Sequence, residues 1–93
     1  MFNERIKQLR EEKGLPLRKI AAAIDIDTAS YCKIEKGDRR ARKEYLPVIA
    51  DFFQIDYEEL LKLWLADQVT ALVEDDKQFT DEVLKLAKKN LKK

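Results

Sequence analysis

Positive side chains crowd one short stretch of this sequence, residues 36–43. The stretch holds five Lys or Arg residues and a single Asp within eight positions. Guanidinium and ammonium groups bind phosphate oxygens through charge-assisted hydrogen bonds, and a segment this polar belongs in an exposed loop rather than in a core. Any one of these cations alone could equally be an ordinary solvated side chain. It is their number within one short segment that indicates an anionic partner. The candidate phosphate ligands, with two cations from an earlier segment, are Lys36, Arg39, Arg40, Arg42, Lys43, Arg18 and Lys19.

The same sequence offers little for catalysis or metal binding. It contains no histidine and one cysteine, Cys32, so the commonest general base and the commonest partner of a Ser or Cys nucleophile are missing. One cysteine also cannot supply a four-ligand zinc site. We therefore expect no enzyme, no catalytic residue, no metal, no cofactor and no small-molecule ligand. Cys32 is expected to be an inert thiol rather than a redox sensor.

Length and composition predict one small helical domain with a single core. The chain has 93 residues, of which 45% are hydrophobic and 40% charged, and it contains only 2 Gly and 2 Pro. This is the composition of a helix-rich globular protein. No apolar run is long enough to span a bilayer, and the first residues lack the apolar stretch of a secretory signal. We expect a cytoplasmic protein without a membrane partner.

Charge is segregated along the chain although the net charge is only +1. Residues 1–43 carry a net charge of +5, residues 44–84 carry −9, and residues 85–93 carry +5. A basic first half suits a polyanion such as nucleic acid, and the acidic middle would be repelled by one. The simpler alternative is that each charged run is a solvated helix face.

Apolar spacing predicts three short helices before the basic loop. The first ends at Gly14, the second opens after Pro16 and ends near Asp25, and the third is capped by Asp27 and ends at Gly37. Inward-facing positions in these helices recur every three or four residues. They are Phe2, Ile6, Leu9, Leu17, Ile20, Ala21, Ile24, Tyr31 and Ile34.

Three further helices are predicted after the loop. The fourth carries an apolar face between residues 46 and 53, and Asp56 with Glu59 predicts a capping box for a long fifth helix that the acidic run 74–76 ends. Thr80 is expected to cap a sixth helix. The basic end of that helix, which complements the helix dipole, consists of Lys85, Lys88, Lys89, Lys92 and Lys93.

Two helices joined by a short turn, the second followed by a basic loop, make the arrangement that a DNA major groove accepts. Residues 5–61 resemble the helix-turn-helix domain of phage repressors and Cro, also called the xenobiotic-response-element family. The ordered positions that carry the resemblance are Leu9, Gly14, Leu15, Ala21, Ile34, Glu35, Gly37, Ile49, Ala50 and Leu60.

The resemblance implies an all-α, five-helix repressor-like bundle with its third helix in the major groove, here with a C-terminal helical extension. It also implies a sequence-specific regulator of transcription, as a repressor or autoregulator, that binds a palindromic double-stranded DNA operator as a homodimer. By position, Thr28, Ala29 and Lys33 match the base-reading sites of the family, and Cys32 lies beside them. The alternative is that the small residues only keep the helix close to DNA without selecting bases.

Three residues depart from the pattern of the family. Leu17 replaces a Gln that commonly holds a phosphate, and neighbouring Arg18 is the expected substitute. Asp25 replaces the usual turn glycine, and because Asp tolerates a left-handed conformation we expect the turn to survive. Pro47 lacks an N–H and is expected to delay or loosen the first turn of the fourth helix, which would lengthen the basic loop.

Residues 1–61 are therefore expected to form the DNA-binding domain and residues 62–93 a helical extension for dimerisation or partner binding. Around residues 63–67 the extension resembles small bacterial regulators, some encoded beside restriction-modification genes. An intramolecular hairpin that covers the same surface is the alternative, and an antitoxin or a protein-binding module that uses the helix-turn-helix as a scaffold is the other functional class. The expected interface residues are Trp64, Leu65, Val69, Leu72, Val73, Val83, Leu84, Ala87 and Leu91.

Overall fold

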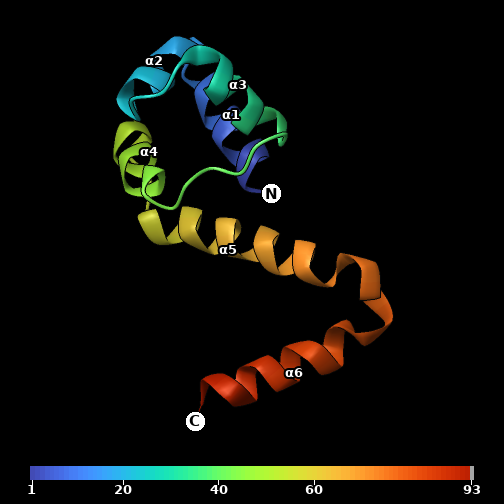
Figure 1. Cartoon of the computed structure of the whole chain (residues 1–93). Coiled ribbons are helices and arrows are strands. Elements are labelled where there is room, and N and C mark those ends of the chain that lie inside the picture. The colour runs from blue at the N-terminus through green and yellow to red at the C-terminus, as the bar shows by residue number, and fades with distance from the viewer. Residues whose placement is uncertain (93) are drawn as a thin grey trace.

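The computed structural model describes residues 1–92, which form six α-helices and one 3₁₀ helix, with no strand among them. Helices α1 to α4 and the first turns of α5 gather into a bundle, and the rest of α5 and α6 form a V-shaped arm (Figure 1). The predicted all-α bundle with a helical extension is confirmed, and Lys93, assigned to the basic end of the last helix, lies outside the described residues. The elements are α1 Phe2–Glu12, α2 Leu17–Ala23, α3 Thr28–Lys36, α4 Tyr45–Phe53, α5 Tyr57–Val73, the 3₁₀ helix η1 Glu74–Phe79 and α6 Thr80–Leu91.

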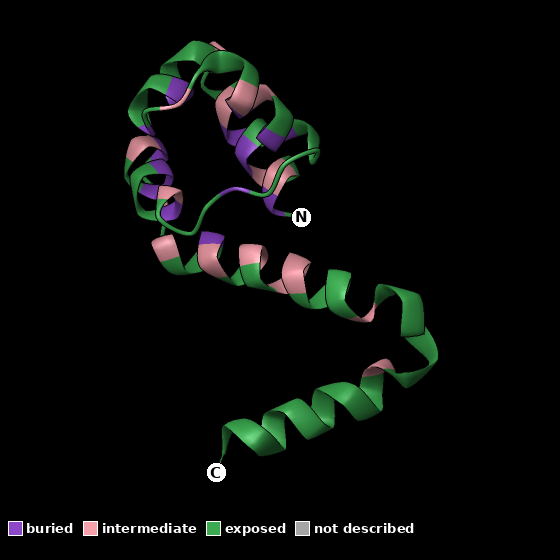
Figure 2. Cartoon of the chain, viewed as in Figure 1, coloured by how far each residue is buried: buried purple, intermediate pink, exposed green. Residues whose placement is uncertain are grey.

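A single core holds the bundle together. Figure 2 shows the buried residues confined to the bundle, while the arm beyond the middle of α5 is mostly exposed. Eight of the nine inward positions predicted for the first three helices are buried, and Leu17 packs against them half-buried. The buried apolar residues are Phe2, Ile6, Leu9, Ile20, Ala21, Ile24, Tyr31, Ile34, Ala41, Leu46, Ile49, Ala50, Phe53 and Leu60.

The turn between α2 and α3 forms with Asp25 in place of glycine. Asp25 has φ +59°, in the left-handed region that a non-glycine residue enters at a cost. The Ile26 N–H donates to the Ala21 carbonyl at 3.0 Å across this turn. The expectation that Asp25 preserves the turn is confirmed.

Three predictions about helix starts are wrong, each for a local reason. Helix α4 begins at Tyr45 and contains Pro47 in its first turn. N–H groups in the first turn have no acceptor within the helix, so the proline costs no intrahelical hydrogen bond. The Asp56 carboxylate does accept the Glu58 N–H at 3.1 Å, but Glu59 does not complete a capping box. Thr80 is the first residue of α6, and Phe79 precedes it without a side-chain cap.

The basic loop is also less uniformly exposed than its composition predicts. Ala41 is buried, with 3% of its surface accessible. Lys36, at the start of the basic segment, is exposed and lies in the last turn of α3. Ala41 is the one small apolar residue in the segment, so it can turn inward while its charged neighbours stay in water. Among the helices of residues 1–92, none has the length and apolarity needed to cross a membrane.

Candidate nucleic-acid interface

Helix α3 is fixed to α1 by a two-pronged ion pair. Arg10 Nε lies 2.8 Å from Glu35 Oε2, and Arg10 Nη2 donates to Glu35 Oε1 at 2.9 Å. The hydrogen bonds to Glu35 raise the pKa of Arg10. Arg10 Nη1 also donates to the carbonyl of Leu15 at 2.9 Å, which ties the turn after α1 to the same side chain. Planar, bidentate pairing sets orientation as well as distance, so α3 has a defined angle on α1.

The two ends of α3 are held by further polar contacts. At its start, the Ser30 N–H donates to Asp27 Oδ1 at 2.9 Å, so the predicted N-cap is confirmed. Hydrogen bonding to Ser30, followed by the positive charges of nearby Arg39 and Lys33, lowers the pKa of Asp27. At its end, Asn3 Nδ2 donates to the Glu35 carbonyl at 3.2 Å. The inner face between the ends is buried, which leaves the outer face for a partner.

The outer face of α3 presents the side chains that the sequence predicted there. Thr28, Ala29 and Lys33 are exposed, and Cys32 is half-buried. Arg39 joins them from the loop, because its Nη1 donates to the hydroxyl of Ser30 at 3.2 Å. We call the exposed group of Thr28, Ala29, Lys33 and Arg39 the α3 surface. It combines a hydroxyl, two methyl groups and the Lys33 cation on α3 with the Arg39 cation of the adjoining loop.

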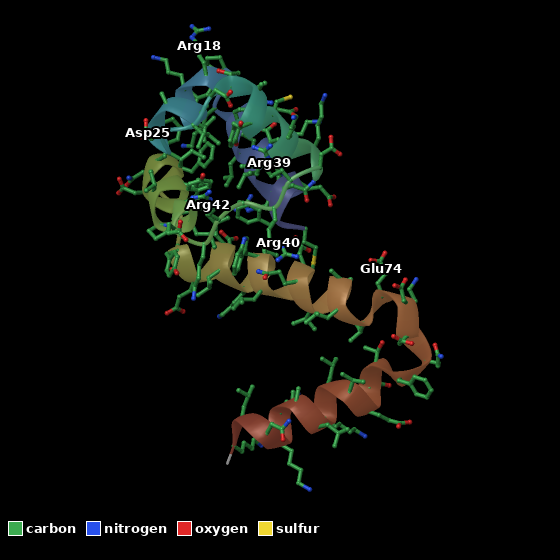
Figure 3. All side chains as sticks on the ribbon, in the orientation of Figure 1. Arg18, Asp25, Arg39, Arg40, Arg42 and Glu74 are labelled. Atoms are coloured by element: carbon green, nitrogen blue, oxygen red, sulfur yellow. The ribbon has the colours of Figure 1, made fainter. Side chains whose placement is uncertain are left out.

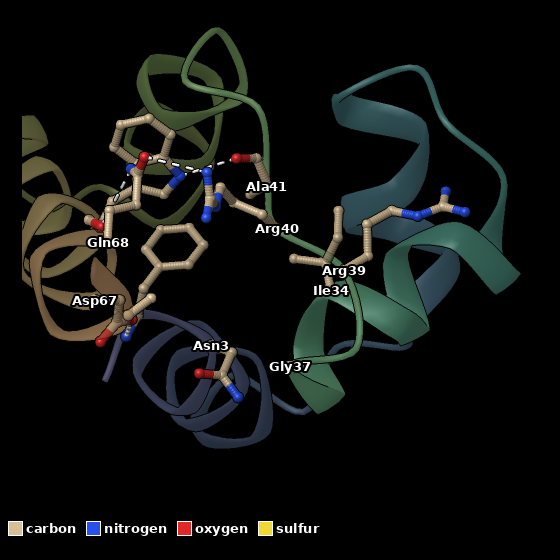
Figure 4. Close-up of a pocket in the computed structure, with 11 residues that line it drawn as sticks. Asn3, Ile34, Gly37, Arg39, Arg40, Ala41, Asp67 and Gln68 are labelled. Atoms are coloured by element: carbon tan, nitrogen blue, oxygen red, sulfur yellow. Dashed lines mark hydrogen bonds between the residues drawn. The ribbon is translucent and has the colours of Figure 1, made fainter. Parts of the chain in front are cut away.

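Two arginines of the loop, Arg39 and Arg40, point in different directions. Figure 3 shows Arg39, Arg40 and Arg42 spread along the segment between α3 and α4, with Arg18 at the far end of the bundle on α2. In the close-up of Figure 4, Arg39 extends toward α3, whereas Arg40 extends to the other side. There Arg40 Nη1 donates to Gln68 Oε1 on α5 at 3.4 Å. Only Arg39 is thus hydrogen-bonded to α3, and Arg40 lies on the side of the loop that faces α5.

All seven candidate phosphate ligands are exposed and free of intramolecular ion pairs within residues 1–92. The carboxylates that do form ion pairs are engaged with α1 or the chain's N-terminal ammonium. A cation without a carboxylate partner keeps its charge available for phosphate oxygens. The bundle therefore carries a set of unneutralised cations around α3 and on α2.

The loop is held from below by Trp64 of α5. Trp64 Nε1 donates to the Ala41 carbonyl at 2.8 Å, and the half-buried indole packs against the core. A pocket of about 330 Å³ lies beside this contact, between α1, the loop and α5. Figure 4 shows Ala41 and Arg40 on its wall, and Trp64 lines it as well. Trp64 was expected at an intermolecular interface, and that expectation stays a prediction; in this structure its indole N–H satisfies an acceptor within its own chain.

Sequence reasoning missed two residues that shape this site. Glu35 was noted only as part of a pattern, yet it is the buried partner of Arg10 with 6% of its surface exposed. Ser30 was passed over, although its hydroxyl orients Arg39. A weak signal existed for Ser30, since it lies three residues after the predicted cap Asp27 and on the same side of the helix.

A family model for the helix-turn-helix matches residues 6–60, more than half of the chain. This chain belongs to the helix-turn-helix family of the Cro and phage-repressor type. Its helices α2 and α3 supply the two helices of the motif, joined through Asp25. The family assignment makes the protein a DNA-binding regulator of transcription whose partner is double-stranded DNA. No curated protein and no solved structure matches the chain significantly.

Beyond the matched region, this helix-turn-helix protein exposes apolar side chains along its arm. Within residues 1–92, α5 and α6 each pack on η1 but make no extensive contact with one another, so the alternative of a closed intramolecular hairpin is wrong for this structure. Val73 is half-buried, and the other predicted interface residues besides Trp64 are exposed. These exposed residues are Leu65, Val69, Leu72, Val83, Leu84, Ala87 and Leu91.

Proposed function

We propose that the protein is a sequence-specific repressor or autoregulator that binds a palindromic operator as a homodimer. Residues 1–61 act as the DNA-binding domain, with α3 in the major groove, and residues 62–93 join the two copies. The observation that carries the proposal is the α3 surface with its surrounding free cations. A rigid helix flanked by unpaired cations suits the major groove, whose floor offers base edges and whose walls are phosphates.

Each residue of the α3 surface has a role that its chemistry permits. The Thr28 hydroxyl donates to or accepts from base edges, and the methyl of Ala29 contacts the methyl of a thymine. Lys33 donates to O6 and N7 of guanine. Arg39, oriented by Ser30 at 3.2 Å, reaches the rim of the groove as a phosphate ligand. Cys32, half-buried beside them, contributes contact area only.

The remaining cations bind the phosphate backbone and set affinity rather than sequence. Lys36, Arg42 and Lys43 flank α3 on the loop side, while Arg18 and Lys19 stand at the start of α2. Arg18 replaces the phosphate contact that Leu17 cannot make. Because each phosphate contact releases a counterion, the affinity should fall steeply as salt rises.

A homodimer follows from operator geometry together with the exposed arm. Two half-sites one helical turn apart are about 34 to 36 Å apart, so the two copies of α3 require a rigid joint. The apolar side chains of the arm offer the material for one. Similarity of the segment around residues 63–67 to small regulators near restriction-modification genes makes the DNA upstream of the protein's own gene the first operator to test.

Fluorescence anisotropy with labelled duplexes tests the proposal. The wild type should bind the upstream duplex more tightly than random-sequence DNA, with both affinities falling as salt rises. Arg39→Ala should weaken binding to both duplexes and reduce the salt slope by about one per site. Lys62→Ala, an exposed cation on α5 away from the α3 surface, is the matched control and should bind like the wild type. Equal affinity for both duplexes would overturn sequence-specific regulation.

The second candidate is a protein-binding module or antitoxin that uses the helix-turn-helix as a scaffold. It is favoured by the exposed apolar arm, which lies outside the DNA-binding motif and could grip a different protein. Such a module would bind neither duplex in a salt-dependent way. That result in the anisotropy experiment would replace the repressor with this alternative.

A further inference from the structure

Helix α6 is amphipathic, and within residues 1–92 it packs on η1 but has no second helix along its apolar stripe. Val83, Leu84 and Leu91 expose 42%, 37% and 86% of their surfaces, and the helix holds no buried residue. Figure 2 shows the helix exposed except for half-buried Thr80 at its start, and separated from the bundle by the bend at η1. An isolated 12-residue helix is marginal in water because nucleation is costly. Its stability therefore calls for a partner along the apolar stripe.

Charge divides α6 and the preceding segment into two opposite halves. Residues 74–82 carry five acidic side chains and one Lys, whereas residues 85–92 carry four Lys and no acid. A helix with an acidic start and a basic end is self-complementary when two copies run in opposite directions. Run in parallel, the same two helices would place acid beside acid and base beside base.

We propose that α6 pairs antiparallel with α6 of a second copy, centred near residue 85. In this register Val83 faces Ala87 of the second copy, and Thr80 faces Leu91. Both pairs lie on one stripe, because a rotation of about 100° per residue brings residues 80, 83, 84, 87 and 91 to the same side of the helix. The inference rests on the homodimer of the proposed function and specifies how its two chains join.

The flanks of the stripe carry the specific charges. Asp81 and Lys88 project from the same side of the stripe, about 20° apart around the helix axis. In an antiparallel pair with the register above, Asp81 of each copy meets Lys88 of the other, giving two equivalent ion pairs related by the two-fold axis. Neither residue has an ion-pair partner within residues 1–92 of its own chain. Charge complementarity thus selects a second copy and its direction.

The stripe of α6 is too short to hold a dimer by itself. A stable interface buries about 1,200 to 2,000 Å² in total, more than two helices of three turns each can supply. Helix α5 contributes the rest through Leu65, Val69 and Leu72, which recur every three or four residues and expose 45%, 40% and 81% of their surfaces. Since α5 and α6 of one chain diverge from η1, two arms can interlock as four helices around a shared apolar centre.

Charge reversal tests the direction of pairing in the full-length protein. Sedimentation equilibrium should show the wild type as a dimer, and Asp81→Lys or Lys88→Asp should each weaken the dimer by about tenfold or more, since both ion pairs become repulsions. An equimolar mixture of the two variants should regain dimer affinity, as should the double variant. Glu12→Lys, an exposed residue of α1, is the control and should stay dimeric. Weakening without recovery in the mixture would overturn the pairing.

Cysteine cross-linking tests the register independently. In a Cys32→Ser background, Thr80→Cys mixed with Leu91→Cys should form a mixed disulfide, because the two positions face each other in the antiparallel pair. Each variant alone should not cross-link through α6. A disulfide in the Leu91→Cys variant alone indicates a parallel pair and overturns the proposal. Circular dichroism should show wild-type helix content in every variant used.

The outcomes separate this inference from the proposed function. If charge reversal weakens the dimer as expected but the protein binds no DNA, the α6 pairing is supported and the repressor function is overturned. If the protein binds the upstream duplex in a salt-sensitive way but no α6 variant changes the dimer dissociation constant, the repressor function is supported and the α6 pairing is overturned. A monomeric wild type at micromolar concentration would remove the pairing and the homodimer together.

Discussion

At the scale of single residues, the pair of Arg10 and Glu35 decides how α3 is presented. Only 17% of the Arg10 side chain and 5% of the Glu35 side chain are accessible, so neither charge can recover water if the other is removed. Nothing in the spacing of these two residues, 25 positions apart, announces the contact. Such a pair is visible only once α1 and α3 are packed, which is why sequence reasoning did not find it.

Replacing Arg10 alone should therefore be costly. Arg10→Met leaves the Glu35 carboxylate buried without its partner and should lower the free energy of unfolding by about 3 kcal/mol, as measured by urea denaturation. The double variant Arg10→Met/Glu35→Met removes both charges and should be much less destabilised than the single variant. A double variant no better than Arg10→Met would show that the pair contributes net stability beyond satisfying Glu35.

Tyr31 makes a prediction about alkaline pH. Its hydroxyl is buried without a hydrogen-bond partner among the described residues, and burial, followed by the nearby charge of Glu35, raises the pKa of Tyr31 well above 10.0. As pH rises above the ordinary tyrosine pKa, the unfolded chain loses this proton while the folded chain keeps it. Stability conferred by the neutral phenol is thus present below pH 10 and declines above it.

Tyr31→Phe should flatten that decline. At pH 7 its free energy of unfolding should equal or exceed that of the wild type by up to about 1 kcal/mol, because a buried hydroxyl without a partner is removed. Between pH 10 and 11.5 the variant should lose less stability than the wild type in urea titrations. Tyr45→Phe, at a half-buried tyrosine that leaves Tyr31 in place, should keep the wild-type slope.

At the scale of elements, α5 serves both the DNA-binding loop and the arm. Its Asp67 accepts the Phe2 N–H at 2.9 Å and so closes the start of α1, while Trp64 holds the loop through Ala41. The basic loop is therefore attached to the helix that carries the proposed dimer surface. Any shift of α5 on dimerisation would reach Arg39 and Arg40 through this attachment.

Trp64→Phe should loosen the loop without unfolding the bundle. The change keeps an aromatic ring but leaves the Ala41 carbonyl without its donor, at a cost of about 1 to 3 kcal/mol. DNA affinity should fall several-fold in anisotropy measurements, while the salt slope stays near the wild-type value because no cation is lost. Phe52→Leu is the control, because this half-buried ring lies on α4 away from the loop. It should lower the free energy of unfolding but leave the DNA affinity of the folded protein unchanged.

Sequence reasoning succeeded for elements whose signals are local. Periodic apolar residues located the helices, and Gly14, Asp27 and Gly37 marked their ends, because capping and left-handed backbone depend on neighbouring residues. It failed where a distant group competes for the same atoms. Glu59 bonds Arg5 at 3.3 Å instead of closing a capping box, and the Trp64 indole takes an acceptor 23 residues away. The candidate site was predicted as a set of residues, but not the divergence of Arg39 from Arg40.

At the scale of the whole molecule, charge and apolar surface lie in different places. Free cations surround α3 and the start of α2, and exposed apolar side chains lie along the arm. Attraction to DNA is electrostatic and is screened by salt, whereas burial of apolar surface is not weakened by it. The two proposed interactions of the protein should therefore respond differently to ionic strength.

Raising the salt concentration from 50 to 200 mM should distinguish DNA binding from dimerisation. With six or more phosphate contacts, DNA affinity should fall by about 10³-fold or more, while the dimer dissociation constant should change by only a few-fold, since its two exposed ion pairs contribute little beside the apolar stripe. Anisotropy and sedimentation equilibrium on the same samples measure both. If the dimer dissociated as steeply as the DNA complex, the arm would be joined mainly by charge, and Leu72→Ser should then leave the dimer intact. If the apolar stripe joins the arms, Leu72→Ser should weaken the dimer at every salt concentration. The change removes a large apolar side chain of α5 from the proposed centre of the dimer and puts a hydroxyl in its place.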